Sequence, residues 1–283
     1  LTSNTTSKMM DQWFFGNRAW IKEELSESDW KIKFTRKALE EIRTMTDRIS
    51  ANPLPIHLRE PGEFKIPELR RLFSKAKKIL DQGCGFCAIE RMPMEEIRIE
   101  ELIGCYWILS QLIGRTVAQK WDGTMIYDVT DTGQSFSYGV RGSYTNVELF
   151  FHNDNAFGIS LPEYVGLFCK NPALKGGTSR FCSIYSVHNR MLENHPRQLE
   201  RLYRPMFFDR QKEHADDAAK MTWAPFFYWD GEQLNARVNI SLVHKGYKLA
   251  KKEMDDELED ALESLAQVVS STDLWIEDPL ERG

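Results

Sequence analysis

The sequence predicts an α+β protein with a β-sandwich or jelly-roll core and flanking helices. Many short stretches rich in β-branched and aromatic residues occur along the chain, and Gly, Pro, Asn and Asp separate them. Several longer stretches repeat apolar residues at helical spacing. Short strands combined with helices in this way are typical of layered α+β domains.

Length and composition favour a single domain. The chain has 283 residues, of which 42% are hydrophobic, and this is enough for one sizeable core. We expect residues 1–82 to form a mainly helical N-terminal region. Residues 83–283 should hold the strand core with helical insertions.

Helix signals occur in both halves of the chain. Ser28 or Asp29 can cap the first helix, and Pro67 and Pro196 suit the first turn of two others. Apolar residues at helical spacing continue each segment and are interpreted as core rather than as a binding surface. The predicted helices cover residues 29–50, 66–82, 95–114, 187–192, 196–202 and 253–269.

Strand signals fill most of the intervening sequence. Asp230-Gly231 is a turn dipeptide between two strand-like stretches and predicts a hairpin. Asp278-Pro279 is expected to begin a turn that reaches Gly283. The predicted strands cover residues 86–91, 121–129, 138–144, 147–152, 162–169, 181–184, 204–210, 222–228 and 234–240.

The segment Phe151-His152-Asn153-Asp154 carries the strongest chemical signal. If residues 147–152 form a strand, His152 and Asp154 project to the same side at or near its end. An imidazole and a carboxylate placed in this way can share one metal ion. With a third ligand they would form the facial triad of non-haem Fe(II) oxygenases, which leaves positions open for a co-substrate and O₂. Because only neutral histidine binds metal, affinity should fall in acid.

Downstream motifs give this short pattern its context. Pro162-Glu163-Tyr164 leads into a strand-like stretch, and Gly176-Gly177-Thr178-Ser179 precedes another. At these spacings the sequence resembles the taurine dioxygenase-like (TauD/TfdA) family of Fe(II)- and 2-oxoglutarate-dependent dioxygenases. The resemblance extends more weakly from about Gly83 to the end of the sequence.

The resemblance implies a fold, a reaction and a cofactor set. The family's fold is the double-stranded β-helix, a jelly roll with helices packed on one sheet. Its members use Fe(II), O₂ and 2-oxoglutarate to oxidise an unactivated C–H bond of a small molecule by hydroxylation, desaturation or cyclisation, and they release succinate and CO₂. The resemblance implies that His152 and Asp154 are iron ligands. It also implies that the Ser179 hydroxyl forms a hydrogen bond with the far carboxylate of 2-oxoglutarate. Ser179 could instead be a turn serine, with Gly176 and Gly177 present only for their positive φ.

The third iron ligand and the arginine that binds 2-oxoglutarate are missing from the expected pattern. In the family they lie in a C-terminal Asn-Arg-x-x-x-His-x-Arg-like segment. Residues 274–283 resemble the approach to that segment, so either the sequence lacks a C-terminal stretch or the site is incomplete. His244 is a candidate substitute, expected outside the helices, although its spacing is short. Arg237 could reach the site, but a surface ion pair explains it equally well.

Candidate substrate-binding residues surround the His-x-Asp motif. Glu148 shares the predicted strand face with His152, so its carboxylate could hold a substrate ammonium or lie solvated at the mouth of the barrel. Tyr144, Asn146 and Asn153 are further pocket candidates.

The net charge, the cysteine spacing and the hydropathy of the chain limit the kinds of partner and location that we expect. A net charge of -5 gives no signature of nucleic-acid binding. The five cysteines lack the spacing of a disulfide framework, and no apolar run is long enough to cross a membrane. We therefore expect a cytoplasmic protein with a small-molecule substrate, and the sequence is compatible with a homo-oligomer. A catalytically inactive jelly-roll protein that binds a small ligand or a partner protein is the alternative, favoured by the missing third ligand.

Overall fold

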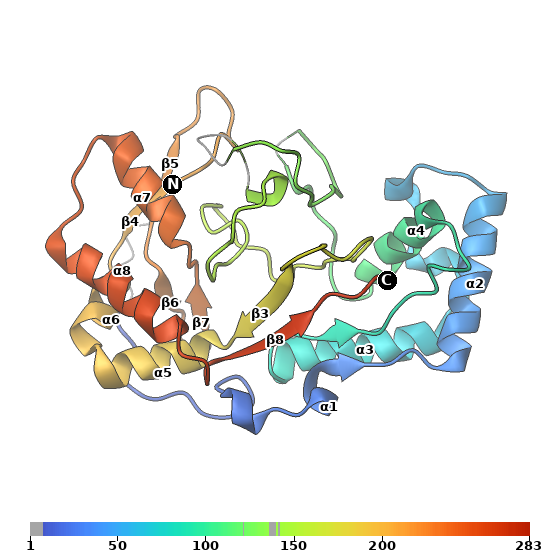
Figure 1. Ribbon diagram of the computed structural model, residues 1–283, viewed down its shortest axis with the longest axis horizontal. Coiled ribbons are helices and arrows are strands. Elements are labelled where there is room, and N and C mark those ends of the chain that lie inside the picture. The colour runs from blue at the N-terminus through green and yellow to red at the C-terminus, as the bar shows by residue number, and fades with distance from the viewer. Residues whose placement is uncertain (1–7, 121, 136–139, 141) are drawn as a thin grey trace. The chain divides into compact units, whose positions relative to one another are not determined.

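The computed structural model of the protein describes residues 8–120, 122–135, 140 and 142–283 (Figure 1). Contacts between residues divide the chain into two compact units, and both are assembled from separate stretches. The first unit takes the residues up to Phe14, Ala118–Glu163 and Ile184–Thr272, and the second takes Phe15–Val117, Tyr164–Ser183 and Asp273–Gly283. Both combine helices with short strands, so the mixed α and β class is confirmed. The single catalytic domain stays a prediction.

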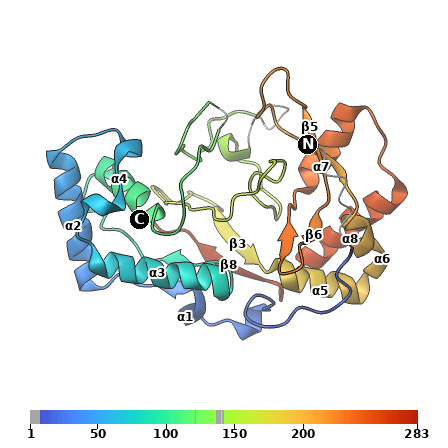
Figure 2. The same ribbon diagram turned by 180° about the vertical axis from the view of Figure 1, so that it is seen from behind.

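The second unit contains a group of helices in which α2 contacts both α3 and α4 (Figure 2). Pro67 occupies the first turn of α3, and the buried residues Leu69, Leu72, Phe73 and Ala76 recur at the spacing of one helix face. The helices are α1 (Glu27–Trp30), α2 (Arg36–Ala51), α3 (Pro67–Gln82) and α4 (Ile99–Ser110), with short 3₁₀ turns at Lys22–Glu24, Ile56–Leu58 and Pro61–Glu63. The strands are β1 (Lys31–Ile32), β2 (Ala88–Ile89), β3 (Thr178–Cys182) and β8 (Trp275–Pro279).

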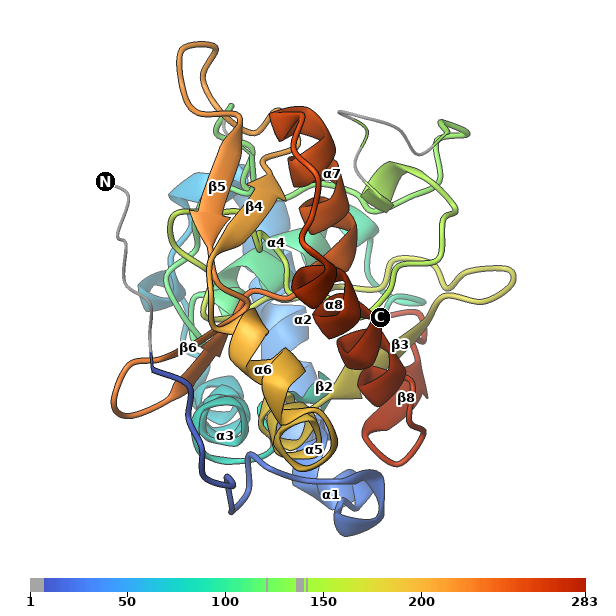
Figure 3. The same ribbon diagram turned by 90° about the vertical axis from the view of Figure 1, so that its left-hand side faces the viewer.

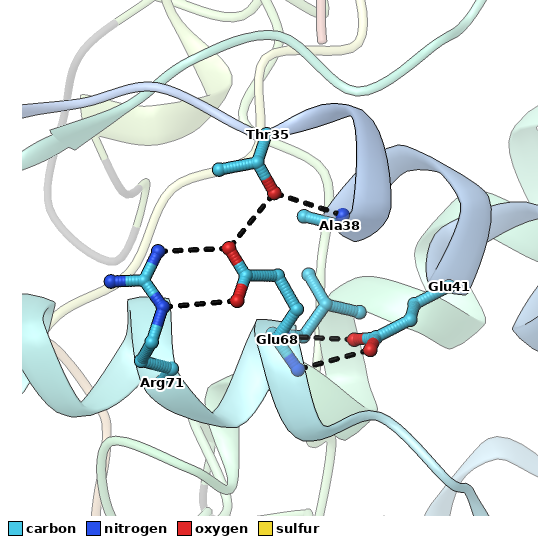
Figure 4. A network of polar contacts seen from close by, with 6 residues as sticks. Thr35, Ala38, Glu41, Glu68 and Arg71 are labelled. Atoms are coloured by element: carbon cyan, nitrogen blue, oxygen red, sulfur yellow. Dashed lines mark hydrogen bonds and ion pairs between the residues drawn. The ribbon is translucent and has the colours of Figure 1, made fainter.

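Polar contacts join the N-terminal ends of α2 and α3 (Figure 4). Thr35 caps α2, because its Oγ1 accepts a hydrogen bond from the Ala38 N–H at 3.2 Å, and it also donates to Glu68 Oε1 at 2.9 Å. Arg71 donates to both oxygens of the same carboxylate. The bonds from Arg71 and then Thr35 lower the pKa of Glu68 to about 2. The stability that this carboxylate contributes is therefore lost only as the pH falls from about 4.5 toward 2.

The carboxylate of Glu41 caps α3 from a neighbouring helix. Ile66, at the N-cap position of α3, makes no side-chain cap bond, and the N–H groups of Glu68 and Leu69 donate to Glu41 at 3.0 and 2.8 Å. Replacing Glu41 with alanine leaves both donors without this acceptor. We expect the free energy of unfolding to fall by about 1 kcal/mol in urea denaturation. Glu40→Ala, which removes an exposed carboxylate of α2, is the control, and an equal loss there would contradict the capping role.

Strands β3 and β8 form an antiparallel ladder in the second unit (Figure 1). Thr178 lies opposite Pro279, and Arg180 lies opposite Glu277, to which its Nε donates a hydrogen bond at 2.6 Å. The prediction of a turn from Asp278 is therefore wrong. Pro279 is tolerated because it is the last residue of a strand in a two-stranded ladder.

In the first unit, α7 packs closely on β4 (Figure 3). A Cβ at Gly246 would lie 2.6 Å from the Phe207 carbonyl oxygen, so the close approach requires glycine. The helices are α5 (Ile184–Asn194), α6 (Pro196–Leu202), α7 (Ile240–Ala250) and α8 (Asp256–Val269). The strands are β4 (Met206–Asp209), β5 (Met221–Ala224), β6 (Phe227–Trp229) and β7 (Leu234–Ala236), paired as β4-β5 and β6-β7.

A buried histidine lies among aromatic rings in the core of the first unit. His188 is 0% exposed, and its ring contacts those of Phe14, Tyr203 and Phe227. Its Nε2 is 2.8 Å from the Tyr203 hydroxyl, and its buried Nδ1 has no hydrogen-bond partner among the residues that the structure describes. Burial lowers the pKa of His188 to about 4, so the imidazole is neutral in the folded chain.

Several predicted strands are wrong. Residues 122–129, 147–152 and 162–169 contain no strand in the part of the chain that the structure describes, and Gly142–Tyr144 is a 3₁₀ turn. Residues 121, 138, 139 and 141 of these predictions lie outside the described residues. In the described part of these segments, the backbone makes isolated hydrogen bonds between loops, such as the one from the Thr130 N–H to the Ser143 carbonyl at 3.0 Å. These bonds do not build a strand ladder. Strand propensity alone does not supply a partner strand.

The six predicted helices correspond to α2, α3, α4, α5, α6 and α8. The start predicted for the first is wrong, because α2 begins at Arg36 and its cap is Thr35, not Ser28 or Asp29. Lys31–Ile32, within the predicted helix, form β1. Helix α7 was not predicted, and the strand expected up to residue 240 ends at Ala236. The hairpin turn at Asp230-Gly231 is confirmed, because β6 and β7 flank it. Over the residues that the structure describes, no helix is both long and apolar enough to cross a membrane.

Candidate functional site

His152 and Asp154 lie together on an irregular loop of the first unit. The His152 Nε2 is 3.2 Å from Asp154 Oδ1, and the two side chains are 30% and 52% exposed. Although the segment is a loop and not the predicted strand, the two groups converge as the motif predicted. Both are accessible to a small ligand, which a packed core pair would not be.

The other ring nitrogen of His152 fixes how the imidazole is presented. Nδ1 is 2.7 Å from the carbonyl oxygen of Phe150. Because a carbonyl only accepts, Nδ1 carries the proton, and the lone pair of a neutral ring is then on Nε2, toward Asp154. The hydrogen bond with Asp154 is the main cause that raises the pKa of His152. A proton or a metal ion between Nε2 and the carboxylate satisfies this arrangement.

The residues present fit two positions of an Fe(II) site. Imidazole nitrogen and carboxylate oxygen are donors of the facial triad, and the bond from Nδ1 to a carbonyl is the orientation that metal-binding histidines commonly have. In the described part of the chain, no third His, Cys, Asp or Glu joins them in a metal-binding group. His244 lies on α7, not outside the helices as expected.

The loop after the pair is held by the segment between β7 and α7. The Asn153 N–H donates to the Val238 carbonyl at 2.8 Å, and the Val238 N–H donates to Asn153 Oδ1 at 2.8 Å. The Arg237 Nη1 donates to the carbonyl oxygens of Ala156 and Gly158 at 3.0 and 2.8 Å. These contacts fix the backbone on which both candidate ligands are carried.

Sequence reasoning did not find this clamp. For Arg237 the sequence suggested either a residue that could reach the site or a surface ion pair, and it gave Val238 no role. The contacts join residues about 80 positions apart, and most use backbone groups that leave no trace in residue types. Asn at position 153 was the one available signal, since its side chain commonly bonds backbone groups.

Ser179 belongs to the second unit and is the second residue of β3, opposite Asp278. Gly176 and Gly177 precede it with φ of 72° and 70°. The left-handed backbone that the sequence allowed is therefore present. This finding accounts for the two glycines and leaves the role of the hydroxyl a prediction.

The remaining candidates lie near the pair in sequence. Asn146 and Glu148 are exposed, and Asn153 is engaged with Val238 through its amide oxygen. The Tyr144 hydroxyl accepts a hydrogen bond from Lys120 Nζ at 2.5 Å. Their contact with substrate stays a prediction.

A groove lies elsewhere in the first unit, on α7 and α8. Its volume is about 410 Å³. Neither His152 nor Asp154 lines it. The lining residues are Ile240, His244, Met254, Glu259, Leu262, Glu263 and Ala266.

Comparison with known proteins gives one family and one fold. The model of the family described as "Taurine catabolism dioxygenase TauD, TfdA family" matches residues 43–283. No curated protein matches the chain. A solved structure of an asparagine oxygenase in complex with Fe(II), 2S,3S-3-hydroxyasparagine and succinate is similar, with 14% identity and a TM-score of 0.66. The likeness covers 89% of this chain and 82% of that one, and it shows a shared fold.

Proposed function

The chain belongs to the TauD, TfdA family, and from this premise we propose that His152 and Asp154 are two of the ligands of its catalytic Fe(II). The protein is an Fe(II)- and 2-oxoglutarate-dependent oxygenase that oxidises an unactivated C–H bond of a small molecule and releases succinate and CO₂. Family membership supports the oxygenase over the alternative, a catalytically inactive jelly-roll protein that binds a small ligand or a partner protein. The 3.2 Å approach of His152 Nε2 to Asp154 Oδ1 is the observation that carries the ligand proposal.

Iron, when bound, supplies the oxidising chemistry, and the residues of the chain orient it. The Phe150 carbonyl accepts the Nδ1 proton and so presents Nε2 as a ligand. Asp154 adds a hard anionic oxygen that suits ferrous iron. The clamp formed by Asn153 and Arg237 keeps both ligands in register.

Ser179 is proposed to hold the far carboxylate of 2-oxoglutarate. Its hydroxyl can donate to a carboxylate, and the positive φ of Gly176 and Gly177 fixes the turn that leads into β3. The support is the match of Gly-Gly-x-Ser to the family's motif. Because the chain belongs to this family, we also propose that its core has the family's jelly-roll fold.

The proposed substrate class is a small amino acid or a close analogue. The similar solved protein is an asparagine oxygenase bound to a hydroxylated amino acid. Glu148 carries an exposed carboxylate four residues before His152 and could pair with a substrate ammonium. Asn146 and Asn153 are the proposed amide contacts.

The test of the function is iron-dependent formation of succinate from 2-oxoglutarate. The purified protein would be incubated in air with Fe(II), 2-oxoglutarate and a panel of L-amino acids, and succinate would be measured by chromatography. We expect succinate with Fe(II) and none when a chelator replaces it. If no panel member and no metal concentration yields succinate above the protein-free control, the enzyme assignment fails.

A further inference from the structure

The groove between α7 and α8 combines an apolar floor with a charged rim. Ile240, Leu262 and Ala266 supply the apolar part. Glu259 and Glu263 also line the groove, and both are exposed. Helix α7 packs on β4, whereas α8 packs on α5 and α6, so each helix is held by different neighbours. Because removing apolar surface from water is favourable, the groove suits a partner that covers its floor.

The charges beside the groove are unpaired within the described residues. Glu259 and Glu263 lie one turn apart on α8, where like charges repel. Lys248 is exposed on α7. Neither the two glutamates nor the lysine makes an ion pair or a side-chain hydrogen bond in the part of the chain that the structure describes. Glu257, on another face of α8, shows the contrast, because it pairs with Arg204 at 2.6 Å.

Opposite charges stand at the same level on the two helices. Helices α7 and α8 run in roughly opposite directions (Figure 1), and residues 251–255 join them. Lys248 lies two residues before the end of α7, and Glu259 lies three residues after the start of α8. One turn further from the connection, His244 on α7 and Glu263 on α8 both line the groove. The groove separates these two rows of side chains, one on each helix.

Rotation about a two-fold axis along the groove brings the rows of two copies together. It places α7 of one copy over α8 of the other and keeps each residue at its level. Lys248 then faces the partner's Glu259, and His244 faces the partner's Glu263. Each contact is made twice, as an isologous interface requires. The same rotation places the two apolar floors face to face.

We propose that two copies of the chain form an isologous dimer through the groove between α7 and α8, in which Lys248 pairs with the partner's Glu259. The apolar floors contribute the burial, and the charged pairs fix the register and disfavour other partners. The groove is small, so the dimer is weak. Neither His152 nor Asp154 lines the groove, so the inference goes beyond the proposed function and does not depend on it.

Sedimentation velocity of the purified full chain would measure the association. We expect the wild type to be mainly dimeric at about 100 µM and mainly monomeric at about 1 µM, which is the behaviour of a small interface. Lys248→Glu places two glutamates opposite each other at both contacts, so the dissociation constant of the dimer should rise at least about tenfold. Glu259→Lys places two lysines there and should have the same effect.

Mixing the two variants separates a lost contact from a damaged fold. In an equimolar mixture, the glutamate at position 248 of one chain faces the lysine at position 259 of the other, and the native pair forms at the second contact. The mixture should therefore dimerise with a dissociation constant within about threefold of the wild-type value. Lys75→Glu is the matched control, because Lys75 is an exposed helical lysine that makes no ion pair among the described residues. It should keep the wild-type constant.

The proposal is overturned if the wild type stays monomeric over the whole range, and the groove would then belong to another occupant, such as a basic protein segment or an organic cation. It is also overturned if the two single variants dimerise as tightly as the wild type, because the dimer then uses another surface. A loss as large in Lys75→Glu, or a mixture that stays monomeric, would show that Lys248 does not pair with the partner's Glu259.

Discussion

Replacing His152 with alanine is expected to lower kcat/KM for iron-dependent succinate formation by at least about 100-fold. The substitution removes Nε2, the nitrogen that faces Asp154. Of this pair, only the Asp154 carboxylate would then remain as a metal ligand. Loss even of a contact that only orients a metal ligand commonly costs 10- to 100-fold, and loss of the ligand itself should cost more. Iron retained per chain after gel filtration, measured with a colorimetric chelator, should fall in parallel.

Two further variants separate metal binding from damage to the loop. Asp154→Asn keeps the shape of the side chain but removes its charge, so both iron retention and turnover should fall. His57→Ala, in a 3₁₀ turn of the second unit, should leave both unchanged. Full iron retention in His152→Ala would refute the ligand assignment, whatever the turnover.

Acid is expected to destabilise the folded chain through His188 by up to about 3 kcal/mol. The folded-state pKa is about 4, below the ordinary value of 6.5, so the unfolded chain binds the proton more readily. The stability present above pH 6.5 is therefore lost as the pH falls from 6.5 toward 4. Urea denaturation at several pH values through this range would measure the slope.

The variant His188→Phe isolates this contribution. Phenylalanine keeps an aromatic ring in the cluster but cannot bind a proton, so the slope of stability against pH should become shallower than in the wild type. The variant should be less stable at pH 7.5, because the Tyr203 hydroxyl loses one of its hydrogen-bond partners. His244→Phe, at an exposed position of α7, should keep the wild-type slope. Equal slopes in wild type and His188→Phe would show that His188 does not cause the acid sensitivity.

The helices could be predicted from sequence because their signals are local. Apolar spacing and Pro67 predicted α3, and Pro196 predicted the start of α6. Helix α7 was missed because it contains Gly246 and several residues typical of strands. Its signal was Asn239, the N-cap residue whose side chain accepts from the Leu242 N–H.

Strands and the site could be predicted only in part, because their partners are distant in sequence. The β3-β8 ladder joins residues nearly 100 positions apart, and nothing near Trp275 indicates this pairing. His152 and Asp154 were found because their relation is local. The clamp by Arg237 and Val238 depends on tertiary contacts. The cytoplasmic location and the homo-oligomer stay predictions.

The β3-β8 ladder also constrains the order of events during synthesis. Residues 273–283 complete the second unit, and all of the first unit is translated before them. On the ribosome, β3 (Thr178–Cys182) therefore emerges long before β8 (Trp275–Pro279). Until β8 is synthesised, the backbone groups of β3 that pair with it have no strand partner. Pairing across such a separation is slow, and exposed strand edges promote aggregation. Nascent chains stalled before residue 275 should need chaperones more than chains that have emerged through Trp275–Pro279.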